Sequence, residues 1–597
     1  MNENLREAGS YFIQKNYKKA IELYYKVLAD NPENTFVLSK IAQCYLFLSN
    51  YDKAISNYER ILELEPHNIE AYLSAAKVYE NTDDIDSAVE FLNLALKYEP
   101  NNTSILENLY FLYVDNEDYE KALYVLRDKL INIMPTSANY FLLAQAYERL
   151  FNYEHALKYY LKSISINENN IDAKMAVARI LFADKDYEKA KKYVVDILTQ
   201  DISNYDAHKL LGQLYIEEEK YALAVDEFNF ALNINPKDDE LYYYIGFCYS
   251  ILKKHDKAIT ALKNTLQINP INHTAKILLA NNYFADGDIE QAQILINEVL
   301  NFMPVNDDAQ KLTAEILMAK HRYERALDRF NSILKRNPND SYCLYKKGVI
   351  LSILGLGEEA QNCFKKAISY NKYDLKSYIA LANSYIDTGK IIKALNCFKR
   401  ALTISADSYD VILGIANAYY LKNDFENARE NYIKILKINP GEHQISYNLG
   451  KIYFRQEDYM LAFKYFKDAV LLNSDDYMYH YDLAKTYIEL AQVEDALEEY
   501  SKSLDLNPAF LDCKLEFADL LAASGNTEKA ITVLKRSIRM FPEEFTIYIR
   551  LSELYQTTGD IKKSNEILDK YLKDRNDIDE DILEKIENMK STLLEVK

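Results

Sequence analysis

The chain has 597 residues, of which 49% are hydrophobic, and a formal net charge of −20. This excess of acid disfavours binding to nucleic acids or to anionic membrane surfaces, both of which recruit basic proteins. The first residues, MNENLREAGSYF, lack the basic start and apolar run of a secretory signal, and no segment approaches the roughly 20 apolar residues that a membrane-spanning helix needs.

A period of 34 residues runs through the sequence from its first residue. Alanine recurs at this spacing in 16 successive copies, from Ala20 to Ala530, and Ser564 takes the seventeenth. A second column of small residues lies twelve positions earlier, and Tyr110 is its one bulky exception. Of the 11 prolines, 10 share one column, and Pro135 lies one residue from it. Because proline breaks helix interiors but is tolerated in turns, this column predicts a turn between successive repeats.

Each repeat is expected to form two helices. Apolar residues recur at spacings of three and four, as in Ile55, Tyr58, Ile61 and Leu62, which is a helical pattern. Halfway along, the column of Asn16 contains Asn or Asp in 11 of 17 copies and is expected to cap the second helix. Five glycines precede this column and suit the end of the first helix.

The predicted repeats, numbered 1 to 17, are 1–34, 35–68, 69–102, 103–136, 137–170, 171–204, 205–238, 239–272, 273–306, 307–340, 341–374, 375–408, 409–442, 443–476, 477–510, 511–544 and 545–576. Residues 577–597 are expected to form a capping helix with an apolar stripe of Ile578, Ile582, Ile586, Met589 and Leu593. In the first repeat Glu3, Glu7 and Ser10 occupy positions that are apolar or small in most other repeats, which suits an exposed first face.

This arrangement resembles the tetratricopeptide repeat family over nearly the whole chain. The matching features are a small residue at position 8, Tyr at 11, Ala at 20, an aromatic residue at 24 and Pro at 32, although the family's frequent Trp at position 4 is missing. The resemblance implies an all-α, right-handed superhelical solenoid of antiparallel helix pairs, closed by the C-terminal capping helix. It also implies a concave groove lined by the first helices, chiefly through positions 2, 5, 9, 12 and 13.

The groove positions of the later repeats carry amide, tyrosine and basic side chains. The candidate partner-binding residues are Asn281, Tyr345, Asn383, Asn417, Tyr420, Tyr447, Lys451, Arg455, Tyr481 and Lys485. Repeated Asn amides can bind the backbone of an extended peptide, Tyr adds apolar area, and Lys suits a carboxylate. We therefore expect repeats 12 to 15 to face a ligand. The alternative is that position 9 tolerates polar residues without a function and that the aromatic residues at position 12 pack inside the helix pair.

No catalytic or metal-binding pattern occurs, so we expect a chain that is not an enzyme and has no catalytic, metal-binding or cofactor-binding residues. The six cysteines, Cys44, Cys248, Cys343, Cys363, Cys397 and Cys513, form no CxxC pair and are interpreted as packing residues in a reducing compartment. These features predict a cytoplasmic protein.

The resemblance implies a non-catalytic scaffold that binds peptide or protein partners in its groove. We expect a monomer unless it is recruited into a complex, with no nucleic acid bound and no direct membrane insertion. One alternative is a substrate-recruiting or regulatory subunit of a separately encoded transferase or other modifying enzyme. Another is a self-assembling structural protein, which the polar face of the first repeat disfavours.

Overall fold

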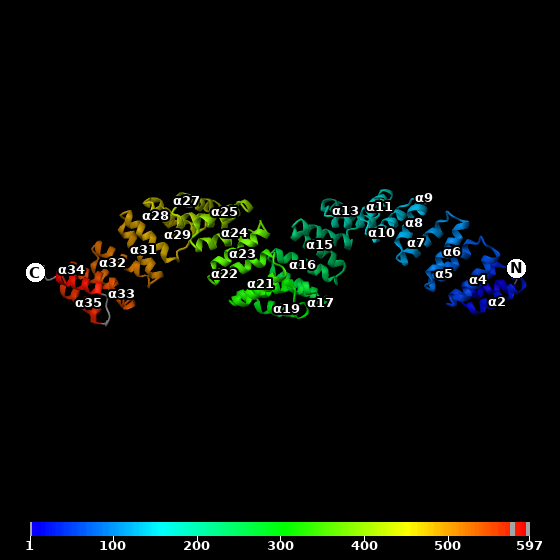
Figure 1. The fold of residues 1–597 in the computed structure, drawn as a ribbon, viewed down its shortest axis with the longest axis horizontal. Coiled ribbons are helices and arrows are strands. Elements are labelled where there is room, and N and C mark those ends of the chain that lie inside the picture. The colour runs from blue at the N-terminus through cyan, green and yellow to red at the C-terminus, as the bar shows by residue number, and fades with distance from the viewer. Residues whose placement is uncertain (1–2, 574–579, 593–597) are drawn as a thin grey trace. The chain divides into compact units, whose positions relative to one another are not determined.

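The computed structural model describes residues 3–573 and 580–592, and every regular element within those ranges is a helix. The chain divides into two compact halves, Met1–Ala309 and Gln310–Lys597, and the division falls inside helix α20 (Asp307–Ala319). We call them the N-half and the C-half. Within each half, antiparallel helix pairs follow one another along the chain (Figure 1).

The first helices of the pairs begin at or near the first residue of each predicted repeat. They are α1 (Glu3–Ile13), α3 (Thr35–Phe47), α5 (Ile69–Asn81), α7 (Thr103–Asp115), α10 (Ser137–Arg149), α12 (Ile171–Ala183), α14 (Tyr205–Glu217), α16 (Asp239–Ile251), α18 (His273–Ala285), α20, α22 (Ser341–Ile353), α24 (Leu375–Asp387), α26 (Tyr409–Leu421), α28 (His443–Arg455), α30 (Tyr477–Glu489), α32 (Leu511–Ala523) and α34 (Phe545–Thr557).

The second helices follow after a short turn. They are α2 (Tyr17–Asp30), α4 (Tyr51–Leu64), α6 (Ile85–Tyr98), the composite helix α8 (Tyr119–Tyr124), η1 (Val125–Leu130) and α9 (Ile131–Ile133), then α11 (Tyr153–Ile166), α13 (Tyr187–Gln200), α15 (Tyr221–Ile234), α17 (His255–Ile268), α19 (Ile289–Phe302), α21 (Tyr323–Arg336), α23 (Gly357–Tyr370), α25 (Ile391–Ile404), α27 (Phe425–Ile438), α29 (Tyr459–Leu472), α31 (Val493–Leu506), α33 (Thr527–Met540) and α35 (Ile561–Lys573). The helix α36 (Glu580–Thr592) comes last.

The turn inside each pair repeats one backbone geometry. Ten of the eleven predicted Asn or Asp caps accept a hydrogen bond from the backbone N–H three residues on, as Asn50 does from Lys53, and Asn526 is the exception. The residue before the cap is left-handed in all 17 repeats. Five of these residues are the predicted glycines, and the other twelve carry side chains at φ between 55° and 64°.

The two columns of small residues lie where paired helices approach most closely. All sixteen alanines from Ala20 to Ala530 have 0% exposed area, as has Ser564. In the earlier column, a Cβ atom added to Gly348 would lie 2.5 Å from Cε1 of Phe364. The small residues are therefore required by the packing of each helix on its partner, as the sequence predicts.

Repeat 4 is irregular at both places where its sequence departs from the pattern. Tyr110 is buried at the position of the usual small residue, and its hydroxyl donates to the Leu142 carbonyl at 3.3 Å. The second helix contains the π-helical segment η1 and runs for one residue more than the second helices of the preceding repeats, while the following connection is one residue shorter. Pro135 is displaced for this reason, and repeat 5 begins in register.

The last described helix packs on the preceding pair. Ile586 is 1% exposed, and Ile582 and Met589 contact the same core cluster as Leu568. Ile578 and Leu593 of the predicted stripe lie outside the described residues. At the other end, Glu3, Glu7 and Ser10 are exposed. Across the described ranges, each helix is too short or too polar to cross a membrane.

Candidate partner-binding groove

The first helices of successive repeats contact one another within each half. Such contacts join α12 to α14 and α16 to α18 in the N-half, and α22 to α24 and α24 to α26 in the C-half. The first helices therefore form a surface of their own along the C-half. The polar side chains at positions 6 and 9 of the repeats from α24 to α32 define the part of this surface that we call the groove. They are Asn383, Asn417, Asn448, Lys451, Asp482, Lys485, Glu516 and Asp519.

A hollow of 380 Å³ lies at the first part of the groove, between α24, α26 and α28. It is lined by the predicted residues Asn383, Asn417 and Tyr420, together with Asn448. Asn417 Oδ1 accepts a hydrogen bond of 2.6 Å from the Tyr432 hydroxyl, which leaves its amide N–H groups as the donors available to a ligand. The Tyr420 hydroxyl is buried and has no hydrogen-bond partner within the described residues.

Basic side chains cover the aromatic rings beside this hollow. Lys451 Nζ lies 5.8 Å from the ring centre of Tyr420 and 5.4 Å from that of Tyr447. The Arg455 guanidinium lies 5.2 Å from the Tyr420 ring centre, and Arg455 is exposed. Lys485 Nζ, one repeat later, lies 5.1 Å from the Tyr481 ring centre. In the part of the chain that the structure describes, neither lysine forms an ion pair with a carboxylate within 4 Å.

Tyr447 and Tyr481 support the wall of the groove and do not project into it. Their exposed fractions are 7% and 8%. The Tyr447 hydroxyl donates to Asp482 Oδ2 at 2.7 Å, and the Tyr481 hydroxyl donates to Glu516 Oε1 at 2.8 Å. This corrects the prediction that both rings face a ligand.

Asp482 and Glu516 are groove residues that the sequence interpretation missed. Burial raises the pKa of Asp482, against the opposing effects of the Tyr447 hydroxyl and of Lys485 and Lys451. Glu516 accepts a second hydrogen bond, of 2.8 Å, from the Tyr500 hydroxyl. The carboxylates lower the positive charge of the groove, so the two lysines are weaker attractors of a ligand carboxylate than their sequence positions indicate.

A signal for these carboxylates was present in the sequence. Positions 6 and 9 lie on adjacent turns of one helix face, so each position 9 residue has a position 6 neighbour. A second hollow, of 400 Å³, is lined by Lys485, Glu516 and Asp519, and Asp519 forms an ion pair with Arg550 at position 6 of the next repeat. Reading position 6 together with position 9 would have shown that carboxylates stand beside the lysines.

Two predicted residues lie apart from this site. Asn281 is exposed on α18 in the N-half, so it is not part of the groove in the C-half. Tyr345, on α22, is half-buried, and its ring centre lies 6.2 Å from that of Phe364 within its own repeat. Of the ten candidates, Asn383, Asn417, Tyr420, Lys451, Arg455 and Lys485 are therefore brought together with side chains at or beside the groove.

Family models of the tetratricopeptide repeat match the chain at five sets of residues. The matched ranges are 53–201, 11–55 with 251–316, 447–509, 341–374 with 375–408, and, for a model described as TPR repeat, 416–457. No curated protein matches the chain.

Solved structures with a similar fold share 16% to 18% of their residues with this chain. The crystal structure of the APC/C hetero-tetramer Cut9–Hcn1 is 17% identical, with 84% of this chain and 98% of that chain covered and a TM-score of 0.37. Yeast Tom70 is 18% identical, with 73% and 98% covered and a TM-score of 0.35. Naa15/Naa10 bound to HypK-THB is 16% identical, with 100% and 97% covered and a TM-score of 0.34.

Proposed function

Because the chain belongs to the tetratricopeptide repeat family, we propose that it is a non-catalytic scaffold that holds an extended segment of a partner protein in its groove. The observation that carries the proposal is a set of solvent-accessible polar groups on successive first helices. These are the amides of Asn383 and Asn417 and the ammonium groups of Lys451 and Lys485.

Each of these groups has a natural partner in an extended peptide. Asn417 uses its carbonyl on Tyr432, so its amide N–H groups can donate to a peptide carbonyl. The Tyr420 ring lines the same hollow and offers apolar area to a peptide side chain. Lys451 and Lys485 both lie close enough to Asp482 to favour its charged form, and both can bind peptide carbonyls or a single acidic side chain.

The test is affinity purification from native extract followed by mass spectrometry. The variant Lys451→Glu with Lys485→Glu is expected to lose the partner, because the groove then carries an unbroken row of carboxylates. The matched control is Lys464→Glu with Lys467→Glu, since these exposed lysines of the second helix α29 also lie over aromatic rings. The control is expected to keep the partner. Equal recovery by both variants would remove the groove proposal.

A second candidate function, recruitment of substrate to a separately encoded modifying enzyme, uses the same groove. Its distinguishing result is an activity that appears only when a co-purified chain is present and that the groove variant lowers. We further propose that the protein is cytoplasmic, on the basis of its six cysteines without a CxxC pair.

A further inference from the structure

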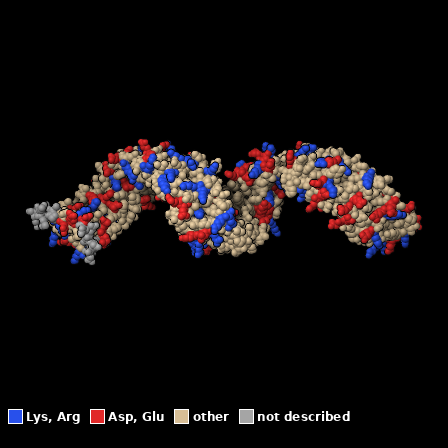
Figure 2. All heavy atoms as spheres, viewed as in Figure 1, with Lys and Arg blue, Asp and Glu red and all other residues tan. Residues whose placement is uncertain are grey.

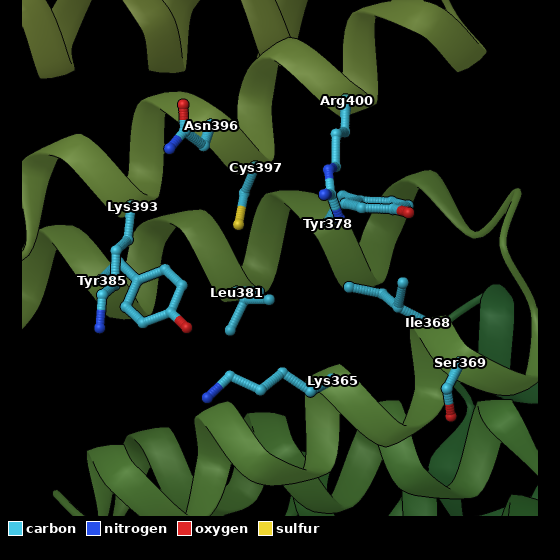
Figure 3. A pocket seen from close by; sticks show the side chains of 10 residues that line it. All are labelled: Lys365, Ile368, Ser369, Tyr378, Leu381, Tyr385, Lys393, Asn396, Cys397 and Arg400. Carbon is cyan, nitrogen blue, oxygen red and sulfur yellow. The ribbon is translucent and has the colours of Figure 1, made fainter.

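A pocket of 630 Å³ lies in the C-half on a different face from the groove, between the second helices of repeats 11 and 12. Lys365 from α23, Lys393 and Cys397 from α25, and Tyr378, Leu381 and Tyr385 from α24 are among the residues that line it (Figure 3). We call it the outer pocket. Figure 3 shows the sulfur of Cys397 and the side chain of Leu381 pointing into its middle, with Tyr385 and Tyr378 on either side.

Two other repeats with the same pair of tyrosines, repeats 3 and 5, fill this space with an aromatic ring. In repeat 5, Tyr159 at position 23 lies between Tyr140 at position 4 and Tyr147 at position 11, with ring centres 6.2 Å and 5.5 Å away. In repeat 3, Phe91 at position 23 makes the same two contacts, at 6.2 Å and 5.2 Å. In these two repeats the ring at position 23 is therefore held between two flanking tyrosines.

Repeat 12 keeps both flanking tyrosines and lacks the central ring. Tyr378 is at position 4, Tyr385 at position 11, and Cys397 at position 23. The tyrosines are 8% and 6% exposed, while Cys397 is the one cysteine of the six that is not buried. Cys397 packs against the core cluster of this region, as the sequence predicts, but its small side chain leaves the space between two rings open.

The rim of the outer pocket is positively charged. Lys365 and Lys393 place their Nζ atoms 5.8 Å and 5.9 Å from the ring centre of Tyr385, and Arg400 lines the other side. No ion pair to a carboxylate involves any of the three within the described ranges. Residues 357–405 contain eight Lys or Arg and four Asp or Glu, in a chain whose net charge is −20. On the face shown in Figure 2, Lys and Arg side chains gather over α24 and α25.

We propose that the outer pocket binds an aromatic side chain of a partner peptide whose flanking residues are acidic. The ring takes the place that Tyr159 occupies in repeat 5, between the two tyrosines and against Leu381 and Cys397. The flanking carboxylates pair with Lys365, Lys393 and Arg400 at the rim. Charge complementarity selects the acidic flanks, and the apolar floor with a missing ring selects the aromatic anchor.

The proposal is tested by fluorescence anisotropy with a fluorescein-labelled peptide in which one Phe is flanked on both sides by Glu and Asp. Two matched peptides replace the Phe by Ser, or the acidic residues by Lys, and both are expected to bind at least about tenfold more weakly. Binding of the acidic Phe peptide is also expected to weaken as salt is added, because the rim contacts are exposed. Inorganic phosphate at matched ionic strength is expected to leave binding unchanged.

The variant Cys397→Tyr supplies the missing ring from the chain itself and is expected to abolish peptide binding. It should keep or raise the melting temperature, because the same residue occupies this position in repeat 5. Cys397→Ser is the control and should bind as the wild type does. Lys365→Glu with Lys393→Glu should weaken binding about tenfold, whereas Lys366→Glu, an exposed lysine beside the pocket, should not.

A measurement on the unaltered chain makes the test independent of the folding of any variant. N-Ethylmaleimide should modify Cys397 before the five buried cysteines, and the Phe peptide should slow that modification, as followed by mass spectrometry. Four results would overturn the proposal. They are unchanged binding by Cys397→Tyr, equal binding of the Ser peptide, displacement by phosphate, and self-association of the chain that Cys397→Tyr abolishes.

Discussion

Exchanging glycine and alanine in the turn inside the helix pairs gives a direct test of backbone strain. Gly389 is left-handed with φ +70°, and a Cβ atom there would have no heavy atom within 4 Å. Ala491 occupies the same position in repeat 15 with φ +60°. A left-handed residue with a Cβ costs about 1–2 kcal/mol. The greater backbone freedom of unfolded glycine offsets about 0.5–1 kcal/mol of that cost. Gly389→Ala should therefore lower the local free energy of unfolding by about 1 kcal/mol, and Ala491→Gly should raise it by a similar amount.

The assay must be local, because repeat arrays unfold in sections and one global transition does not describe them. Native-state hydrogen exchange with mass spectrometry, read on peptides from residues 375–408 and 477–510, should show exchange that is about fivefold faster for Gly389→Ala and slower by a similar factor for Ala491→Gly. Gly441→Ala is the matched control. Gly441 is not left-handed and its added Cβ meets only Asn439 Oδ1, at 3.6 Å, so this change should be neutral or slightly stabilising. The reasoning is refuted if Gly389→Ala and Gly441→Ala shift exchange in the same direction.

Three further substitutions test packing and charge. Gly348→Ala should lower the melting temperature, because overpacking against Phe364 costs about 1–3 kcal/mol and exceeds the gain in helix propensity of about 1 kcal/mol; a higher melting temperature would contradict the close approach. The Glu499 hydrogen bond raises the pKa of His480 above 6.5, while His480 and Lys502 outweigh burial and lower that of Glu499 below 4.5. His480→Gln should therefore lower the melting temperature most between pH 4.5 and 6.5, where His480 is protonated and Glu499 is ionised. The loss should shrink as the pH rises through the pKa of His480 in the folded protein. Thermal unfolding at several pH values measures this dependence. Since burial raises the pKa of Asp482, Asp482→Asn should raise the melting temperature at neutral pH, with an advantage that fades on acidification; a constant advantage would exclude a charge effect.

The helix pairs were predictable because single residues mark them. The alanine column defines where two helices touch, and the Asn or Asp column defines where the second helix begins. The left-handed turn was predictable only where glycine reveals it. Lys15 or Phe151 adopts the same backbone without a sequence signal, because the surrounding helix pair imposes it.

The repeat positions that form the groove could be read from the sequence, but the carboxylates beside its lysines were missed. Asn383, Asn417, Lys451 and Lys485 were found by position, whereas the effect of Asp482 depends on which neighbouring helix it faces. The outer pocket was overlooked for a related reason. A buried or partly buried cysteine is usually a packing residue, and only the ring contacts in repeats 3 and 5 show that the same space can hold something larger.

The irregular second helix of repeat 4 has a consequence for how such arrays change length. The π-helical segment holds an additional residue, and the connection before Ser137 gives one up. The helix can therefore gain a residue that the connection loses, so that their combined length stays the same. An insertion near Val125 need not rotate the repeats that follow. A mutation that lengthens one element is compatible with the original spacing of every later repeat, provided that a nearby deletion compensates for it.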